Sequence, residues 1–120
     1  MGYDIHFKVK VEGIDKYITV GDCEANITWN VREIIRKSTG LEWNNEENNG
    51  LCKDVMLRIT EGLTELTYRP NEYKQYEAGN KYGTVEGCRR FFLQILKDWE
   101  DFCEDTNTKD LADVATFWID

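Results

Sequence analysis

Two short polar segments, each directly before a predicted helix, carry the side chains best suited to bind a ligand. Residues 26–30 read Asn-Ile-Thr-Trp-Asn, and residues 80–84 read Asn-Lys-Tyr-Gly-Thr. The first turn of a helix has backbone N–H groups without intrahelical partners and the positive end of the helix dipole, which together favour phosphate or carboxylate. If the two segments converge in the fold, they form a small polar pocket with an aromatic wall.

Aromatic and basic side chains accompany both segments. Trp29, Trp43 and Tyr82 can stack on a base, while Arg32 and Lys81 can add positive charge. The predicted ligand site comprises Asn26, Thr28, Trp29, Asn30, Trp43, Tyr82, Gly83 and Thr84. Ordinary helix capping and core packing of the aromatic rings explain the same residues without a ligand, so both interpretations stay open at this point.

Residues suited to catalysis or metal binding are few. His6 is the only histidine, and it is predicted on the polar face of a strand with no cysteine placed beside it. Cys23, Cys52, Cys88 and Cys103 lack the close spacing of a structural zinc site, and the chain has no phosphate-binding glycine loop. We therefore expect a protein that is not an enzyme and that needs neither a metal nor a cofactor.

The elements that must position these residues follow from periodicity. Alternating apolar residues predict a hairpin, and apolar residues at spacings of three and four predict helices. The predicted strands cover residues 3–11, 16–21 and 114–119, and the predicted helices cover 31–38, 51–68 and 84–103, with an extra short turn after Pro70. This order, ββααβ with an extra short helix, predicts a single α+β domain. Its sheet is small, mostly antiparallel and three-stranded, with about three helices on one face.

The longest helical pattern, residues 84–103, has one apolar stripe: Val85, Cys88, Phe91, Phe92, Ile95, Leu96, Trp99, Phe102 and Cys103. Such a stripe is typical of a core-facing helix. Thr84 is the predicted N-cap. Gly87, in the first turn, lowers helix stability by about 1 kcal/mol relative to alanine. That penalty indicates close approach of another backbone or of a ligand.

Composition limits the partners. The chain has 120 residues and a net charge of −8. Direct binding to duplex nucleic acid is disfavoured, because no basic patch neutralises the phosphates; a basic protein surface suits the charge better. Acidic residues gather in one region, at Asp98, Glu100, Asp101, Glu104, Asp105, Asp110 and Asp113. With neither a signal-peptide pattern nor a membrane-spanning run, we expect a cytoplasmic protein with no membrane partner.

Several short motifs resemble those of a group of phage proteins. They are Tyr3-Asp4-Ile5, the 26–30 segment, Pro70 with Tyr73, and Gly83-Thr84-x-Glu86-Gly87 followed by Phe92-Leu93. Together they resemble small uncharacterised proteins of tailed phages, prophages and some bacteria, in which Trp often stands where this chain has Tyr82. The resemblance implies no activity. It implies a phage setting, where small accessory proteins often counter host defences.

Two functions are compatible with these features. The first is a non-enzymatic phage accessory protein that sequesters a nucleotide-type signalling molecule in the host cytoplasm. The second is an acidic protein inhibitor, anti-CRISPR-like or a nucleic-acid mimic, that blocks a basic host effector by charge-assisted contact. An unpaired edge of the sheet would also allow a homo-oligomer to form by strand pairing.

Overall fold

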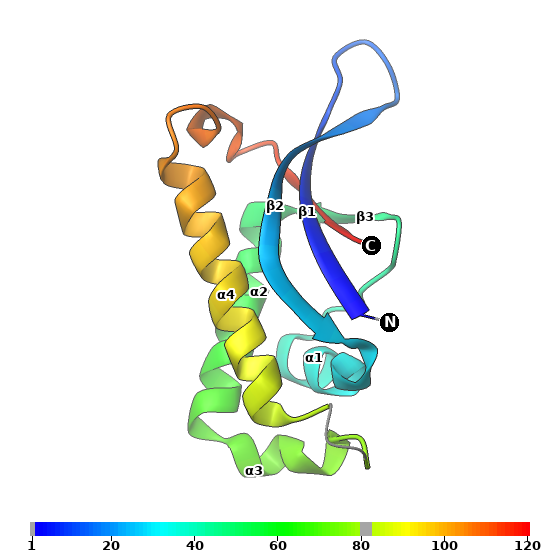
Figure 1. Ribbon diagram of the computed structural model, residues 1–120, viewed down its shortest axis with the longest axis vertical. Helices are drawn as coiled ribbons and strands as arrows, with labels where there is room; N and C mark the ends of the chain where they lie inside the picture. The colour runs from blue at the N-terminus through cyan, green and yellow to red at the C-terminus, as the bar shows by residue number, and fades with distance from the viewer. Residues whose placement is uncertain (1, 80–82) are drawn as a thin grey trace.

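The N-terminal hairpin is the centre of the fold in the computed structural model, which describes residues 2–79 and 83–120. Strand β1 (Gly2–Lys10) pairs antiparallel with β2 (Tyr17–Thr28). Along β1, Tyr3, Ile5 and Phe7 are buried, whereas the residues between them reach the opposite face. One face of the sheet therefore packs against the helices, as Figure 1 shows for the layer formed by α2 and α4.

The sheet has four strands in the order β2-β1-β4-β3, so the predicted three-stranded sheet is wrong by one strand. Strand β4 (Thr116–Ile119) pairs antiparallel with β1 as predicted. The additional strand, β3 (Asn48–Leu51), pairs antiparallel with β4. Its sequence, Asn-Asn-Gly-Leu, has neither alternation nor β-branched residues, and pairing with β4 rather than local propensity makes it extended.

Strand β2 is longer than predicted, because Gly21 and Asp22 do not end the hairpin. Two register shifts, between Asp4 and His6 and between Phe7 and Lys8, carry the ladder past this point. A Cβ atom added at Gly21 would lie 2.9 Å from the Phe102 ring, so the glycine here allows close approach of helix α4. Gly21, the last residue of the predicted second strand, instead lies within a longer strand and is a packing contact.

The helices begin and end near their predicted limits. They are α1 (Arg32–Thr39), α2 (Cys52–Tyr68), the short α3 (Pro70–Tyr73) and α4 (Val85–Glu104). The start of α1 differs from the prediction, since a 3-10 turn (Trp29–Val31) precedes it and Thr28 caps that turn. Helix α1 itself starts from Val31 without a side-chain cap, so Asn30 is not the N-cap that its sequence position predicted.

Helix α4 packs against both β2 and α2 and supplies three of the buried aromatic residues, Phe91, Phe92 and Phe102. The Phe7 ring lies 5.3 Å from Trp99 and 5.2 Å from Phe102, edge to face, which joins the sheet to this helix. Phe92 and Phe117 are fully buried beside them. Across residues 2–79 and 83–120, no helix combines the length and apolarity that a membrane span requires.

Candidate functional site

The two polar segments do meet, at Gly83 and Asn30. A Cβ atom added to Gly83 would lie 2.7 Å from both the Cβ and the carbonyl oxygen of Asn30. Real Cβ atoms do not come this close to backbone atoms, so the contact requires glycine. The segment before α4 and the turn before α1 are therefore in direct contact.

The backbone donors at the start of α4 already have partners within the protein. Thr84 caps the helix as predicted, its Oγ1 accepting from the Gly87 N–H at 3.0 Å. A carboxylate oxygen of Glu77 accepts from the Val85 N–H at 2.7 Å. An anionic ligand at this helix start would have to displace Glu77, which occupies the position where a phosphate would bind.

The polar side chains of the first segment also bond within the protein. Asn26 donates to a carboxylate oxygen of Asp4 at 2.6 Å, and the Thr28 hydroxyl accepts from the Asn30 N–H at 3.5 Å. These bonds fix the end of β2. Asn80, Lys81 and Tyr82 lie outside the described residues, so the predicted stacking role of Tyr82 stays a prediction.

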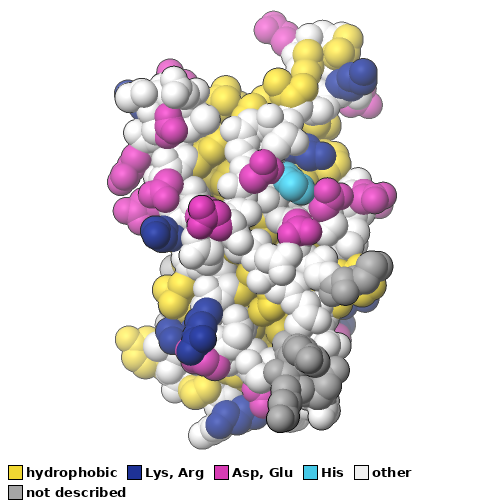
Figure 2. Space-filling view, viewed as in Figure 1, with side chains coloured by type: hydrophobic (Ala, Val, Ile, Leu, Met, Phe, Trp, Pro, Cys, Tyr) yellow, Lys and Arg dark blue, Asp and Glu magenta, His cyan; other side chains and the backbone are white. Residues whose placement is uncertain are grey.

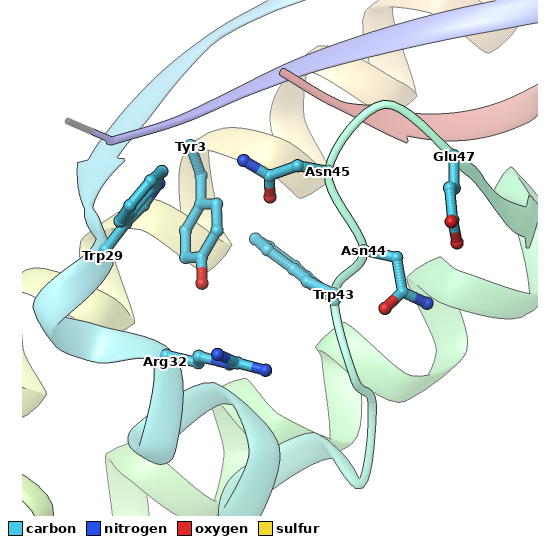
Figure 3. Close-up of a pocket in the computed structure, with 7 residues that line it drawn as sticks. All are labelled: Tyr3, Trp29, Arg32, Trp43, Asn44, Asn45 and Glu47. Carbon is cyan, nitrogen blue, oxygen red and sulfur yellow. The ribbon is translucent and has the colours of Figure 1, made fainter.

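An open hollow of about 430 Å³ lies on the other side of this junction, between the start of β1, the turn before α1 and the loop that leads to β3. Its lining residues are Tyr3, Trp29, Arg32, Trp43, Asn44, Asn45 and Glu47. Figure 3 shows Trp29, Tyr3, Trp43 and Asn45 around one part of the hollow and Arg32 below them, while Asn44 and Glu47 lie across the loop.

The aromatic wall is held firmly in place. The Trp29 indole N–H donates to the Gly2 carbonyl at 3.0 Å, while the ring remains 42% exposed and open to stacking. Trp43 is only 6% exposed and forms the floor, with its ring centroid 5.3 Å from Tyr3 and 5.7 Å from Phe91. The face of Trp29 is therefore the surface on which a planar ligand can stack.

The loop after Trp43 is tied to the sheet. Asn45 forms an isolated bridge with Ile119, and the Glu46 N–H donates to the Ile119 carbonyl at 2.8 Å. The side-chain amide of Asn49 donates to the carbonyls of Asn44 and Glu47, each at 2.9 Å. The polar run that sequence alone predicted as a loop is thus fixed along one wall of the hollow.

Two donors in this wall have no ion pair or hydrogen bond with any described residue. Four of the six arginines pair with glutamates, but within the described chain Arg32 and Arg69 form no ion pair. The indole N–H of Trp43 is buried, and no described residue accepts a hydrogen bond from it. Burial raises the pKa of Tyr3, and the positive charge of Arg32 opposes this effect.

The structure thus separates the predicted site residues into two groups. Trp29 and Trp43 line the hollow, with Arg32, which the sequence indicated as a source of charge. Asn26, Thr28, Asn30, Gly83 and Thr84 instead build the junction beside it, and sequence reasoning missed the hollow's remaining residues: Tyr3, Asn44, Asn45 and Glu47. The positions of the loop residues depend on the pairing of β3 with β4, which no local pattern predicted.

A second hollow, of about 260 Å³, lies between β2 and the C-terminal half of α4 and is mainly acidic. Its carboxylates are Asp22, Glu24, Asp98, Asp101 and Asp105. Asp98 also accepts from the Glu24 backbone N–H at 2.9 Å, which fixes its carboxylate beside the outer strand. Figure 2 shows acidic side chains across the upper half of one face of the molecule, around the single histidine.

His6 and the cysteines are set apart from the aromatic hollow. His6 Nδ1 bonds to Asp22, and its Nε2 lies 3.2 Å from a carboxylate oxygen of Asp120, outside hydrogen-bond geometry. Burial raises the pKa of the thiols of Cys23, Cys52 and Cys88, so they are poorly ionised at neutral pH. Among the described side chains, no three of the His, Cys, Asp or Glu type gather as a metal site.

Comparison of the chain with protein-family models, with curated proteins and with solved structures gives no match.

Proposed function

We propose that this protein binds a nucleotide-type signalling molecule in the hollow between Trp29 and Trp43 and withholds it from its receptor without chemical change. The observation that carries the proposal is the wall itself, where a fixed, partly exposed indole accompanies a guanidinium that has no carboxylate partner among the described residues. Base stacking on an aromatic ring contributes about 1–3 kcal/mol, and a guanidinium binds phosphate through two parallel hydrogen bonds.

The volume and the fixed wall support binding of a small ligand. Ligand pockets commonly measure roughly 300–1,000 Å³, and this hollow of about 430 Å³ lies near the lower limit. Because Trp29, Trp43 and the 44–49 loop are held by other contacts, little ordering is needed when a ligand enters. We propose that the protein acts in counter-defence in a phage-infected cell, because its short motifs resemble those of phage proteins.

Titration calorimetry tests this function with nucleosides, mononucleotides, cyclic di- and trinucleotides and ADP-ribose derivatives. We expect at least one to bind, and Trp29→Ala to weaken it by about tenfold or more through loss of stacking. Tyr68→Ala is the matched control, because Tyr68 is 80% exposed on α2 and does not line the hollow. No binding by any compound removes the proposal.

Recovery of the ligand separates sequestration from catalysis. After incubation with excess protein and denaturation, we expect chromatography to return the ligand unchanged. A product that forms with the wild-type protein and not with Trp29→Ala would show an enzyme and overturn the non-catalytic proposal.

A second candidate, inhibition of a basic host protein, is favoured by the acidic hollow along β2 and α4. Its carboxylates would attract a basic surface and speed association, in a salt-dependent way. Pull-down from host lysate at low and high salt, repeated with Asp101→Lys, tests it. Asp15→Lys, at the hairpin turn, is the control. A partner whose capture depends on neither salt nor Asp101 argues against this function.

A further inference from the structure

Among the residues that the structure describes, the charged groups that line the hollow are one cation and one anion. Arg32 supplies the guanidinium, Glu47 supplies a carboxylate, and Asn44 and Asn45 are neutral amides. The rest of the protein adds no excess of positive charge, since the net charge is −8. A ligand with one negative charge would be matched by Arg32, whereas each further phosphate group would meet repulsion from Glu47 and from the acidic protein as a whole.

The form of the phosphate matters for the same reason. A terminal phosphate monoester carries about −1.5 to −2 charges at neutral pH, because its second pKa is about 6. A phosphodiester has no second proton to lose and carries a single charge. One guanidinium can therefore neutralise a diester fully, but leaves part of the charge of a monoester and most of the charge of a triphosphate uncompensated.

The Glu47 carboxylate indicates a second chemical group that the ligand should carry. An ionised carboxylate only accepts hydrogen bonds, so it suits sugar hydroxyl groups. Figure 3 shows Arg32 below Trp29 and Tyr3, with Glu47 across the loop that carries Asn44 and Asn45. A ligand that stacks its base on Trp29 would therefore meet Arg32 on the same side of the loop, and Glu47, which also lines the hollow, beyond it.

We infer that the hollow selects a mononucleotide with a singly charged phosphodiester and a free sugar hydroxyl, the chemistry of a 3′,5′-cyclic mononucleotide. This inference rests on the proposed nucleotide binding and makes it specific. The volume of about 430 Å³ fits one nucleotide better than two or three joined together. Arg32 binds the diester, Trp29 stacks on the base, and Glu47 accepts from the hydroxyl and disfavours additional phosphates.

The test is a calorimetric series in which only the phosphate changes. For each of the bases adenine, guanine, cytosine and uracil, the probes are the nucleoside, the 3′,5′-cyclic monophosphate, the 5′-monophosphate and the 5′-triphosphate, with cyclic dinucleotides added. For at least one base, we expect the cyclic mononucleotide to bind about tenfold or more tightly than the nucleoside. The triphosphate and the cyclic dinucleotides should bind more weakly than the cyclic mononucleotide.

Two substitutions, each with a matched control, test which side chains cause the selectivity. Arg32→Gln should remove the advantage of the cyclic mononucleotide over the nucleoside, whereas Arg69→Gln, which changes the other arginine without an ion pair, should leave it intact. Glu47→Gln should improve triphosphate binding relative to the nucleoside, and Glu12→Gln, at an exposed carboxylate in the hairpin turn, should not. Thermal unfolding of each variant confirms that it is folded.

The outcomes distinguish the inference from the function on which it rests. Affinity that rises with the number of phosphates, tighter binding of cyclic dinucleotides, or no response to Glu47→Gln overturns the inference while nucleotide binding stands. Absence of binding by every nucleoside and nucleotide in the series overturns the proposed function as well.

Discussion

Two regions of this molecule present N–H donors that could face a ligand, and they differ in whether those donors already have partners among the described residues. At the start of α4, Thr84 and Glu77 accept from the first-turn amides, and Gly83 packs directly on Asn30. In the hollow, Arg32 has no ion pair within the described residues, and no described acceptor faces the buried Trp43 N–H. The first is a structural junction, and the second is open to a ligand.

The difference shows why donor-rich helix starts are ambiguous in a sequence. A ligand that displaced Glu77 would gain one set of charge-assisted bonds and lose another, leaving little net affinity. Among the described residues no carboxylate pairs with Arg32, so a ligand in the hollow would not have to displace one. An unsatisfied buried donor such as the Trp43 N–H, which has no acceptor among the described residues, destabilises the protein by about 1–3 kcal/mol.

The largest expected effect comes from removing the floor of the hollow. Trp43→Ala should lower the free energy of unfolding by about 3–5 kcal/mol, because it leaves a cavity among Tyr3, Phe91 and Phe117. Urea denaturation followed by circular dichroism measures this change. A loss below about 1 kcal/mol would contradict the packing described for this ring.

Trp43→Phe sharpens the same test. Phenylalanine keeps a six-membered ring in the floor. It removes the indole N–H, which has no partner among the described residues, together with the five-membered ring that carries it. We expect a smaller loss of stability than for alanine, because a smaller cavity is left. A loss as large as that of Trp43→Ala would contradict an N–H without a partner at this position.

The second largest effect is expected from disrupting the contact between Gly83 and Asn30. Gly83→Ala places a Cβ atom 2.7 Å from the Asn30 backbone and should lower the free energy of unfolding by about 1–3 kcal/mol, as overpacking commonly does. Gly79→Ala is the control, since a Cβ atom there meets nothing within 4 Å among the described residues. Equal stability of both variants would show that the two segments are not in tight contact.

The elements with strong periodicity were predictable from sequence. Helix α4 and its Thr84 cap, helix α2 and the pairing of β4 with the hairpin follow from local patterns that tertiary packing reinforces. Strand β3 was not predictable, because its polar residues are extended only where β4 offers an edge. Gly21 was predicted as the end of the second strand, because a sequence does not reveal the approach of Phe102 that explains a glycine within it.

Only some of the residues that line the hollow could be predicted from the sequence. Trp29 and Trp43 were recognisable as aromatic residues near helix starts, and Arg32 as a nearby charge. Tyr3 was indistinguishable from any other core residue of an alternating strand. Asn44, Asn45 and Glu47 belong to a polar run that only the bonds to Asn49 and Ile119 turn into a wall. Conversely, the Glu77 carboxylate that fills the start of α4 comes from a residue eight positions away, beyond any capping pattern.

A third effect tests the cap at the start of α4. Thr84→Ala should lower the free energy of unfolding by about 1 kcal/mol, because the Gly87 N–H loses its acceptor. Thr84→Ser keeps a hydroxyl and should recover most of the loss. Neither change should alter nucleotide affinity by more than about twofold, since Thr84 does not line the hollow. A large loss of affinity in a stable Thr84→Ala protein would return the ligand site to the start of α4.

The smallest effect concerns Glu86, on the first turn of the same helix. Hydrogen bonds from Arg89 at 3.0 and 2.8 Å, with a further bond from Arg90, lower the pKa of this carboxyl from 4.5 to about 2. A carboxyl whose pKa is lower in the folded than in the unfolded state stabilises the protein fully above pH 4.5. That contribution is lost as the pH falls from 4.5 towards 2.

Glu86→Gln should therefore reduce the urea midpoint slightly at pH 7 and by less at pH 3. Solvent screening of this exposed group keeps both changes small. Glu12→Gln, at a carboxylate without an ion pair in the described chain, should show no such pH dependence. Equal differences at the two pH values would mean that Arg89 does not hold Glu86 in the ionised form. The start of α4 would then keep only the contacts made by Thr84 and Glu77. Its contrast with the hollow would be weaker.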